Sequence, residues 1–404
     1  MNVDRFPAVL AAAAHGRILA DNAGGTQLPD LALERMQRFL AYDNAQRGSV
    51  FARELAASEL VEQAKRGFAA LLAVPAERIG IGANATTLAL AFSRLLASTI
   101  DKGNRIVVTA ADHEANVAPW MWLRRFGAQV DVVPVTPSGE LDESKYHAYL
   151  ERAPRLVALP WASNVTGTVF DVARLARSAK RAGAAVVVDS VQALPHMPLE
   201  IDGAVDFAFF SGYKVYAPHV GFWYMSESAF DRFVRADDSH LPAEARYWTI
   251  ETGTQSHEGL AGWLGTLAYF ADVAGTARQA IGAFARYEAE LSNYARRKFS
   301  ERLPDVRLYG PPPSEERLPV FAFNVASIPA EELALRFERA NIEGRVGDFY
   351  APRLLQALAP DAGGRAVRLS FAHYNTIDEI DRCFDVIDAA LSREQSTDAA
   401  PLPL

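Results

Sequence analysis

The most constraining feature of this sequence is a regular alternation of short apolar runs and helical segments between residues 79 and 225. The runs are rich in β-branched and aromatic residues and cover residues 105–109, 129–134, 156–160, 185–189 and 207–210. Because apolar strands that alternate with helices are typical of parallel sheets covered on both faces, the pattern predicts an α/β fold with a mostly parallel sheet. Ligands of such folds bind beyond the carboxyl ends of the strands, where Asp189 and Ser211 fall.

The regular alternation of strand-like runs and helical segments ends after residue 265, which indicates a second, smaller α+β domain in the C-terminal part of the chain. The elements predicted there are a long helix at 279–302, strands at 306–309, 320–325 and 366–371, a helix at 330–340, a loop at 344–352 and a last helix from residue 377. We therefore expect a large domain of residues 15–262, a small domain of residues 1–14 plus 263–391, and a disordered tail at 392–404.

The composition favours an enzyme that acts on small molecules. The chain of 404 residues has a formal net charge of −8 and no dense block of Lys and Arg, so we expect neither nucleic acid nor a membrane as a partner. The apolar stretch Phe6–Ala14 follows a segment without net positive charge and predicts a short helix rather than a signal peptide. The single cysteine, Cys383, excludes an intrachain disulfide, and we expect a cytoplasmic protein without a metal ion.

Lys214 is the residue that most strongly indicates the type of reaction and its cofactor. It closes the tetrapeptide Ser211-Gly212-Tyr213-Lys214 downstream of Asp189, with Gln192 between them. A lysine amine can form a Schiff base with an aldehyde cofactor, and an acid can keep the ring nitrogen of pyridoxal phosphate protonated. At this point two simpler interpretations stay open, because Ser-Gly-Tyr-Lys is also typical of a surface turn and Asp189 could cap the next element.

Three further segments place polar groups beside predicted strand ends. Ala85 and Thr86 stand where a strand leads into a helical run, and backbone N–H groups at a helix N-terminus suit a phosphate. His113 follows the strand at 105–109, where an imidazole could lie flat on a planar ring, and Asn164 follows the strand at 156–160 and could donate to a phenolate oxygen. Each also has a structural interpretation, as a helix cap, a packed histidine or an Asn-containing turn.

Together these residues resemble the class V, fold-type I pyridoxal-phosphate enzymes, which include cysteine desulfurases, selenocysteine lyases, isopenicillin-N epimerase and kynureninase. The resemblance runs from the segment at 19–26 to Tyr374-Asn375-Thr376 and implies a seven-stranded, mostly parallel sheet flanked by helices. It implies pyridoxal 5'-phosphate as the cofactor and Lys214, Asp189 and His113 as the catalytic residues. The implied cofactor contacts are Ala85, Thr86, Ser211 and Tyr213 at the phosphate, His113 on the ring, Asn164 and Gln192 at the phenolic oxygen, Asp189 at the ring nitrogen, and Lys214.

The same resemblance implies a set of substrate-binding residues and an oligomeric state. Arg368 matches the arginine that binds the α-carboxylate of an amino-acid substrate, which a guanidinium can hold in one plane. Asn22 and Tyr350 are expected at the substrate as well. Thr254, in Glu251-Thr252-Gly253-Thr254, matches the threonine that reaches the phosphate of the partner subunit, so we expect a homodimer with composite active sites.

Two departures from the family pattern bear on the reaction. Cysteine desulfurases carry a nucleophilic cysteine in the small-domain loop after an Arg-x-Gly element, and Tyr350 holds that place here. A phenol cannot accept a sulfane sulfur as a thiolate does, and Cys383 lies in an apolar helical pattern typical of a core. Tyr213 stands where the family usually has a histidine before the lysine, a change that we expect cofactor binding to tolerate.

We therefore expect a cysteine-desulfurase-like C–S lyase that eliminates a β-substituent from an α-amino acid without a protein persulfide. Lys214 would be the base that removes the Cα proton. A class V aminotransferase or an amino-acid epimerase is the alternative, since the same residues serve all three reactions, and a non-catalytic regulator with this fold is a remote third. The segments 348–353 and 241–248 are expected to decide among these reactions.

Overall fold

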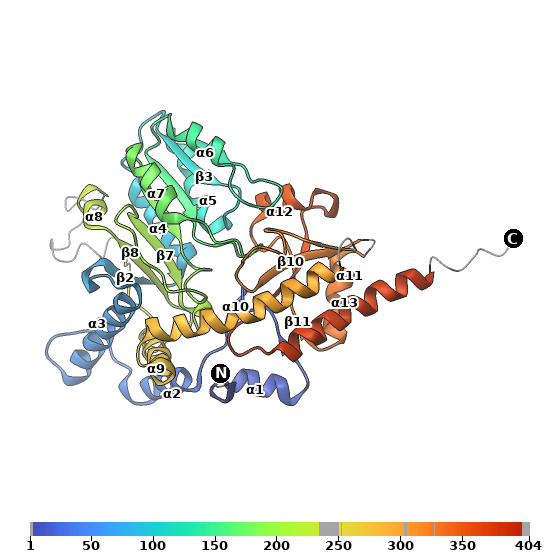
Figure 1. Cartoon of the computed structure of the whole chain (residues 1–404). Helices are drawn as coiled ribbons and strands as arrows, with labels where there is room; N and C mark the ends of the chain where they lie inside the picture. The colour runs from blue at the N-terminus through green and yellow to red at the C-terminus, as the bar shows by residue number, and fades with distance from the viewer. Residues whose placement is uncertain (1–2, 234–249, 252, 303–304, 327, 398–404) are drawn as a thin grey trace.

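The computed structural model describes residues 3–233, 250–251, 253–302, 305–326 and 328–397. Over these residues the chain forms a seven-stranded sheet, a four-stranded sheet and a two-stranded pair, with helices packed around them (Figure 1). The large sheet has the strand order β2-β8-β7-β6-β5-β3-β4. Its strands are β2 Ile79–Gly82, β3 Arg105–Thr109, β4 Gln129–Val133, β5 Leu156–Pro160, β6 Ala185–Asp189, β7 Phe207–Ser211 and β8 Gly221–Met225.

The large sheet is mostly parallel, as predicted. Strands β4, β3, β5, β6 and β7 pair in parallel, and β8 runs antiparallel to both of its neighbours. All five strands predicted from the sequence are present, and β3, β5 and β6 have the predicted bounds. The carboxyl ends of β5, β6 and β7 consequently meet at one edge, with Pro160 opposite Asp189 and Asp189 opposite Phe209.

Side chains of β6 alternate between two buried clusters, which explains why this strand is apolar on both sides. Val186 and Val188 belong to one cluster with Phe68 of α3 (Ala52–Leu72), whereas Val187 belongs to the other with Phe92 of α4 (Ala85–Ala97). Both faces of the sheet are therefore covered. The other helices of this part are α2 Asp30–Arg38, α5 Ala118–Trp122, α6 Glu143–Leu150, α7 Val172–Arg181, α8 Glu227–Phe233 and α9 His257–Ala274.

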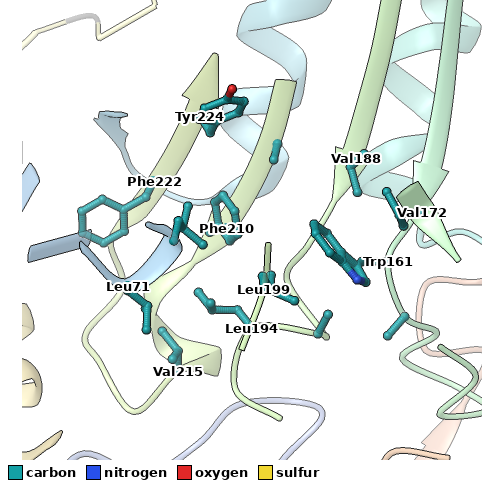
Figure 2. Packing of buried hydrophobic residues seen from close by; sticks show 14 of the residues in the cluster. Leu71, Trp161, Val172, Val188, Leu194, Leu199, Phe210, Val215, Phe222 and Tyr224 are labelled. Carbon is teal, nitrogen blue, oxygen red and sulfur yellow. The ribbon is translucent and has the colours of Figure 1, made fainter. Parts of the chain in front are cut away.

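Aromatic rings fill the first cluster. Phe68 stacks on Phe222 of β8 with ring centroids 4.1 Å apart and meets Phe210 of β7 edge-on at 5.0 Å. Figure 2 shows Phe210 and Phe222 on these two strands, with Leu71 of α3 below them. Because burying one such side chain stabilises a fold by about 1.5–3 kcal/mol, this packing holds α3 firmly on the sheet.

The C-terminal part forms the smaller α+β unit that the sequence predicts. Its four strands, counted over the described residues, are all antiparallel to their neighbours in the order β12-β13-β10-β9. They are β9 Val306–Leu308, β10 Val320–Val325, β12 Arg345–Gly347 and β13 Ala366–Ser370, and the helices are α10 Ala277–Arg302, α11 Ala330–Arg339, α12 Pro352–Leu358 and α13 Ile377–Thr397. The long helix α10 extends from beside α9 to the smaller sheet and links the two parts (Figure 1).

Some elements of the structure cross the domain limits expected from the sequence. Helix α9 runs without a break across the predicted boundary between residues 262 and 263. Helix α1 (Pro7–Ala14) confirms the short helix predicted near the N-terminus. Phe6, just before it, packs against Tyr216 of the expected large domain and against Tyr269, His373 and Tyr374 of the expected small domain. Strand β1 (Ile18–Leu19) pairs with β11 (Ile342–Glu343) of the small part, while Leu19 also packs against the first cluster of the large sheet.

Two local expectations also change. The loop expected at 344–352 contains β12, because its three residues pair with β13, and the first residue of α12. Helix α13 continues to Thr397, so residues 392–397 of the expected tail are helical, and residues 398–404 lie outside the described part of the chain. Among the described helices, none is both long enough and apolar enough to cross a membrane.

Candidate active site

The predicted site residues meet at the carboxyl ends of β6 and β7. Asp189 is the last residue of β6, Ser211 is the last of β7, and Lys214 closes the short 3-10 turn Gly212–Lys214 that follows. Gly212 permits this turn, since a Cβ there would lie 2.8 Å from the carbonyl oxygen of Pro218. The turn therefore brings Lys214 back over the edge of the sheet.

The amine of Lys214 lies in a partly buried, mixed-charge environment. Its Nζ donates a hydrogen bond to the carbonyl oxygen of Ala23. Burial, together with the guanidinium groups of Arg368 and Arg345, lowers the pKa of Lys214 from 10.5 to about 7, against the opposing effect of Asp21 and Asp189. Near neutral pH a large share of this amine is therefore unprotonated, which is the form that attacks an aldehyde or accepts a proton.

Two carboxyl groups face the same small cavity. Burial raises the pKa of Asp189 to about 6, although the N–H of Val191, 2.9 Å from Oδ1, and the amine of Lys214 act in the other direction. Burial and the charge of Asp189 raise the pKa of Asp112 well above its usual range. A cationic ring nitrogen near Asp189 would stabilise its ionised form, so this acid suits the pyridinium of pyridoxal phosphate.

Asp112 was missed by the sequence reasoning. Its Oδ2 accepts from the Thr109 hydroxyl at 3.2 Å and from Asn116 Nδ2 at 3.1 Å, and its side chain is buried. The available signal was its position directly before His113 and just after β3, where an acidic side chain must lie close to the strand ends.

A cavity of about 50 Å³ lies between these groups. It is lined by every cofactor residue predicted from the sequence except Thr254, namely Ala85, Thr86, His113, Asn164, Asp189, Gln192, Ser211, Tyr213 and Lys214. Among the described residues, the buried atoms Oδ1 of Asp112 and Oε1 of Gln192 have no hydrogen-bond partner. Unsatisfied buried polar atoms around a reactive lysine fit a polar ligand at this place.

The N-terminus of α4 lies at one end of this cavity and carries groups that suit an anion. Asn84 caps the helix by accepting from the Thr87 N–H at 2.9 Å, and Ser211 Oγ accepts from the Ala85 N–H at 3.0 Å. Gly221 of β8 allows the close approach, because a Cβ there would lie 2.7 Å from the backbone nitrogen of Asn84. The helix dipole, the Thr86 backbone and hydroxyl, and the Ser211 hydroxyl together suit a phosphate group.

His113 is held as a neutral ring beside Lys214. Its Nδ1 accepts the N–H of Ala115 at 3.0 Å, which leaves Nε2 as the protonated nitrogen of a neutral imidazole. Burial and the cations Lys214 and Arg368 lower the pKa of His113 to about 4. A neutral imidazole can lie against an aromatic cofactor ring without a charge penalty, in agreement with the role implied for His113.

A second cavity of about 410 Å³ adjoins the first and shares Thr86, His113, Asn164, Tyr213 and Lys214 with it. Arg368 and Tyr350 line this larger space. Arg368 Nη2 donates to Asp21 Oδ1 at 2.7 Å, and its Nη1 donates to the carbonyl oxygen of Asn164 at 2.9 Å. The guanidinium of the fully buried Arg368 is thus fixed in orientation, as carboxylate recognition requires.

Asp21 is a second residue that sequence reasoning did not single out. Its other carboxylate oxygen, Oδ2, accepts from Arg345 Nε at 2.7 Å, so one carboxylate bridges two guanidinium groups. Gly24 leaves room for this carboxylate, because a Cβ at Gly24 would lie 2.3 Å from Asp21 Oδ2. The guanidinium groups of Arg368 and Arg345 together with the carboxylate of Asp21 have a net positive charge, which suits the α-carboxylate of an amino acid.

The loop that holds Tyr350 spans the mouth of the larger cavity. Tyr350 is 69% exposed, and its ring centroid lies 5.7 Å from that of His113. The backbone of the loop is tied to the large domain, since Asn164 Nδ2 donates to the Phe349 carbonyl at 2.9 Å and the Glu114 N–H donates to the Tyr350 carbonyl at 2.7 Å. Arg353 forms an ion pair with Glu114.

Asn22 and Thr254 lie away from both cavities. Asn22 is buried, and its Nδ2 donates to the carbonyl of Ser370 and to Asn375 Oδ1, both at 2.9 Å, so it joins the N-terminal segment to the small domain. Thr254 is exposed, while Glu251 before it accepts from the Ile81 N–H at 2.7 Å. The segment 241–248, expected to influence specificity, lies outside the described residues.

Comparison with known proteins gives this site its context. The family model described as Aminotransferase class-V matches residues 18–383. The chain belongs to the class-V aminotransferase family. It is therefore a pyridoxal-phosphate-dependent enzyme, and the residues around Lys214 fit that cofactor. This assignment, with Lys214 and Asp189 both in the cavity, leaves no support for a non-catalytic regulator.

Relatives of this class-V enzyme include cysteine desulfurases. One from Pectobacterium atrosepticum is 31% identical over 403 residues, which cover 93% of this chain and 94% of that protein. A "Probable cysteine desulfurase" of Mycolicibacterium paratuberculosis is 30% identical over 378 residues, and the match covers 89% of this chain but about half, 53%, of that protein.

Solved structures show the same fold. A cysteine desulfurase from Thermococcus onnurineus has a TM-score of 0.84 at 25% identity, with 96% of this chain and 98% of that chain covered. The cysteine desulfurase CsdA from Escherichia coli, an S-sulfonic acid form, has a TM-score of 0.81 at 26% identity, with 96% and 97% covered.

Proposed function

We propose that this class-V enzyme eliminates the β-substituent of an α-amino acid, as a cysteine-desulfurase-like C–S lyase that forms no protein persulfide. The observation that carries the proposal is the placement of the only thiol. Cys383 is fully buried among the apolar side chains of α13 and the small sheet, and burial raises the pKa of its thiol. We also assign Tyr350 to the loop position where a desulfurase would hold its cysteine, on the Arg-x-Gly element at 345–347 that precedes it.

The residues of this chain supply the binding and the proton transfers. Bound pyridoxal phosphate provides an electron sink that makes the Cα–H bond of an amino acid acidic. Arg368 would hold the α-carboxylate, and the amine of Lys214 would accept the Cα proton. Asp189 would keep the proton on the ring nitrogen, and the neutral His113 would support the ring face.

The net elimination balances without an oxidant or reductant. Cysteine and one water give pyruvate, ammonia and hydrogen sulfide, and an S-substituted cysteine gives the corresponding thiol. The leaving sulfur departs from the β-carbon with the electron pair of the C–S bond. Nothing in this reaction needs a thiolate on the protein.

The decisive experiment incubates the purified enzyme with L-cysteine and with S-substituted cysteines. We expect pyruvate, ammonia and sulfide or thiol in equal amounts, with no sulfur adduct on the protein by intact-mass analysis. Alanine as the product, together with one added sulfur on Cys383, would contradict the proposal and indicate a desulfurase.

A class V aminotransferase or an epimerase remains the second candidate. It rests on the same residue, Lys214, because a lysine that accepts the Cα proton can also return it to the substrate or to the cofactor. Racemised amino acid, or a keto acid without loss of the β-substituent, would identify these reactions in the same incubations.

We also propose a homodimer with composite sites. Three large side chains near the start of α3 are mostly exposed, Tyr42 and Val50 at 75% and Phe51 at 68%, which is unusual for a monomer surface. His257, close to Thr254 in the chain, contacts the same region through a hydrogen bond between its Nδ1 and the Ala45 carbonyl, 3.1 Å apart. A partner that covers this face would bring its Thr254 toward the neighbouring site.

The single, buried cysteine supports our further proposal that the enzyme works in the cytoplasm, where thiols stay reduced.

A further inference from the structure

A buried chain of hydrogen bonds leads from α10 to the cofactor cavity. Glu288 of α10 lies 2.6 Å through Oε2 from His196 Nδ1, and His196 Nε2 lies 3.2 Å from Gln192 Nε2. All three side chains are at most 4% exposed. Gln192 lines the small cavity beside Lys214, so this chain connects the long helix to the place where the cofactor binds.

The chemistry of the three groups fixes the direction of these bonds. As a carboxylate, Glu288 can only accept, from the hydroxyl of Tyr216 at 3.2 Å through Oε1 and from His196 through Oε2, so His196 Nδ1 is the donor. In a neutral imidazole, Nε2 is then an acceptor. It can receive one of the two N–H groups of Gln192, which leaves the second N–H of that amide free to donate elsewhere.

We propose that Glu288 and His196 are positioning residues that orient the amide of Gln192, so that one of its N–H groups is kept for an acceptor oxygen of the bound cofactor. Without the acceptor on His196, nothing in the described residues would hold the amide in this orientation, because Oε1 has no partner there. A carbonyl oxygen cannot donate to a phenolate, so rotation would replace an attraction by a repulsion. The proposal depends on the cofactor and not on which reaction the enzyme catalyses.

Glu288 contacts a second wall of the site through the same carboxylate. Tyr216, which donates to Oε1, lies two residues after Lys214, and its backbone N–H donates to Thr26 Oγ1 at 2.8 Å. The turn that bears Lys214 and the turn that bears Gln192 are thus both fixed to one residue of α10.

Glu288→Gln tests the proposal with little change in shape. The glutamine keeps an acceptor for Tyr216 but presents an amide to His196, which favours a proton on Nε2 and reverses the bond to Gln192. The phenolic oxygen of the bound cofactor would then lose a hydrogen-bond donor. We therefore expect the visible absorption spectrum of the cofactor to change. Release of pyridoxal phosphate at equilibrium should become roughly 2- to 12-fold easier, the factor that corresponds to one hydrogen bond.

A double-mutant cycle separates positioning from a general structural effect. In a Gln192→Ala background, Glu288→Gln should change neither the spectrum nor the cofactor affinity any further, because the chain of hydrogen bonds no longer reaches the cofactor. His196→Asn should give the same spectrum as Glu288→Gln, since asparagine can still donate to Glu288 but lacks the second ring nitrogen. If Glu288→Gln fails to fold, the spectrum of His196→Asn tests the same proposal.

Ser292→Ala is the matched control. Ser292 lies one turn further along α10, is 1% exposed and donates to the Arg317 carbonyl at 2.8 Å, away from the cavity. It should lower the melting temperature without moving the spectrum. Effects of Glu288→Gln and Gln192→Ala that simply add, or a Glu288→Gln spectrum identical to that of the parent enzyme, would overturn the proposal.

Discussion

The perturbed amine of Lys214 gives a prediction about how fast the cofactor attaches. A lysine with its ordinary pKa of 10.5 is unprotonated in roughly 1 of 3,000 molecules at pH 7. With a pKa of about 7, half of the Lys214 side chains are unprotonated at the same pH. Schiff-base formation should therefore reach a plateau above pH 7 and fall about tenfold for each pH unit below it.

The assay follows the visible absorption that develops when pyridoxal phosphate is added to the cofactor-free protein between pH 5.5 and 9. Borohydride reduction and peptide mapping then verify that the label is on Lys214 and not on Lys65 or Lys102. A rate that keeps rising tenfold per unit up to pH 9 would show an ordinary lysine and refute the reasoning.

Two substitutions test the electrostatic origin of this pKa with opposite signs. The Asp21 carboxylate favours the charged form of Lys214, so Asp21→Asn should move the midpoint of the rate profile to lower pH. The Arg345 guanidinium disfavours the charged form, so Arg345→Gln should move the midpoint to higher pH. Since both variants break the same ion pair, each is the control for the other. If both variants move the midpoint of the rate profile in the same direction, the effect comes from a loss of structure and not from the change in charge.

Three further predictions concern the catalytic acid, the assembly and the thiol. Asp189→Asn should still bind pyridoxal phosphate but lose about 10²-fold or more in turnover, because the charge that holds the ring proton is removed; near-normal turnover would mean that another group, such as Asp112, holds it. Inactive Lys214→Ala and inactive Thr254→Ala proteins should regain part of the activity after they are mixed and refolded together, whereas a fully active monomer in sedimentation would exclude composite sites. Cys383→Ala should keep its activity and lose about 1 kcal/mol of unfolding free energy from the core, and a loss of activity at unchanged stability would place the thiol in the reaction.

The strands and the central site residues were predictable because their signals are local. Asp189 ends a run of five residues that is apolar on both faces, and the tetrapeptide with Lys214 follows the next such run, so the parallel-sheet rule alone places both at one edge. The sequence order also identified Ala85 and Thr86, since a helix must begin after β2. These inferences needed no knowledge of distant contacts.

The missed features depend on contacts between distant parts of the chain. Asp21 acquires its role from Arg368, 347 residues away, and from Arg345, neither of which can be paired with it by spacing. Strand β12 has three residues and forms because β13 lies beside it, so its own sequence resembles a loop. Asn22 is expected at the substrate from the resemblance alone, and its hydrogen bonds to the Ser370 carbonyl and to Asn375 are a further long-range feature that the sequence does not indicate.

The contacts of the loop at 348–353 also bear on the proposed reaction. A loop that delivers a thiol to a substrate and then carries the sulfur away must leave the site, and the bonds that hold it must be few. Here Asn164 and the Glu114 backbone hold two consecutive carbonyls of the loop, and Arg353 adds an ion pair to Glu114. The ring of Phe349 lies 4.7 Å from the Arg368 guanidinium, so release of the loop would also uncover the group that we propose for the substrate carboxylate. Such a loop is better suited to act as a wall of the substrate site than as a carrier, which is what an elimination without a protein-bound sulfur requires.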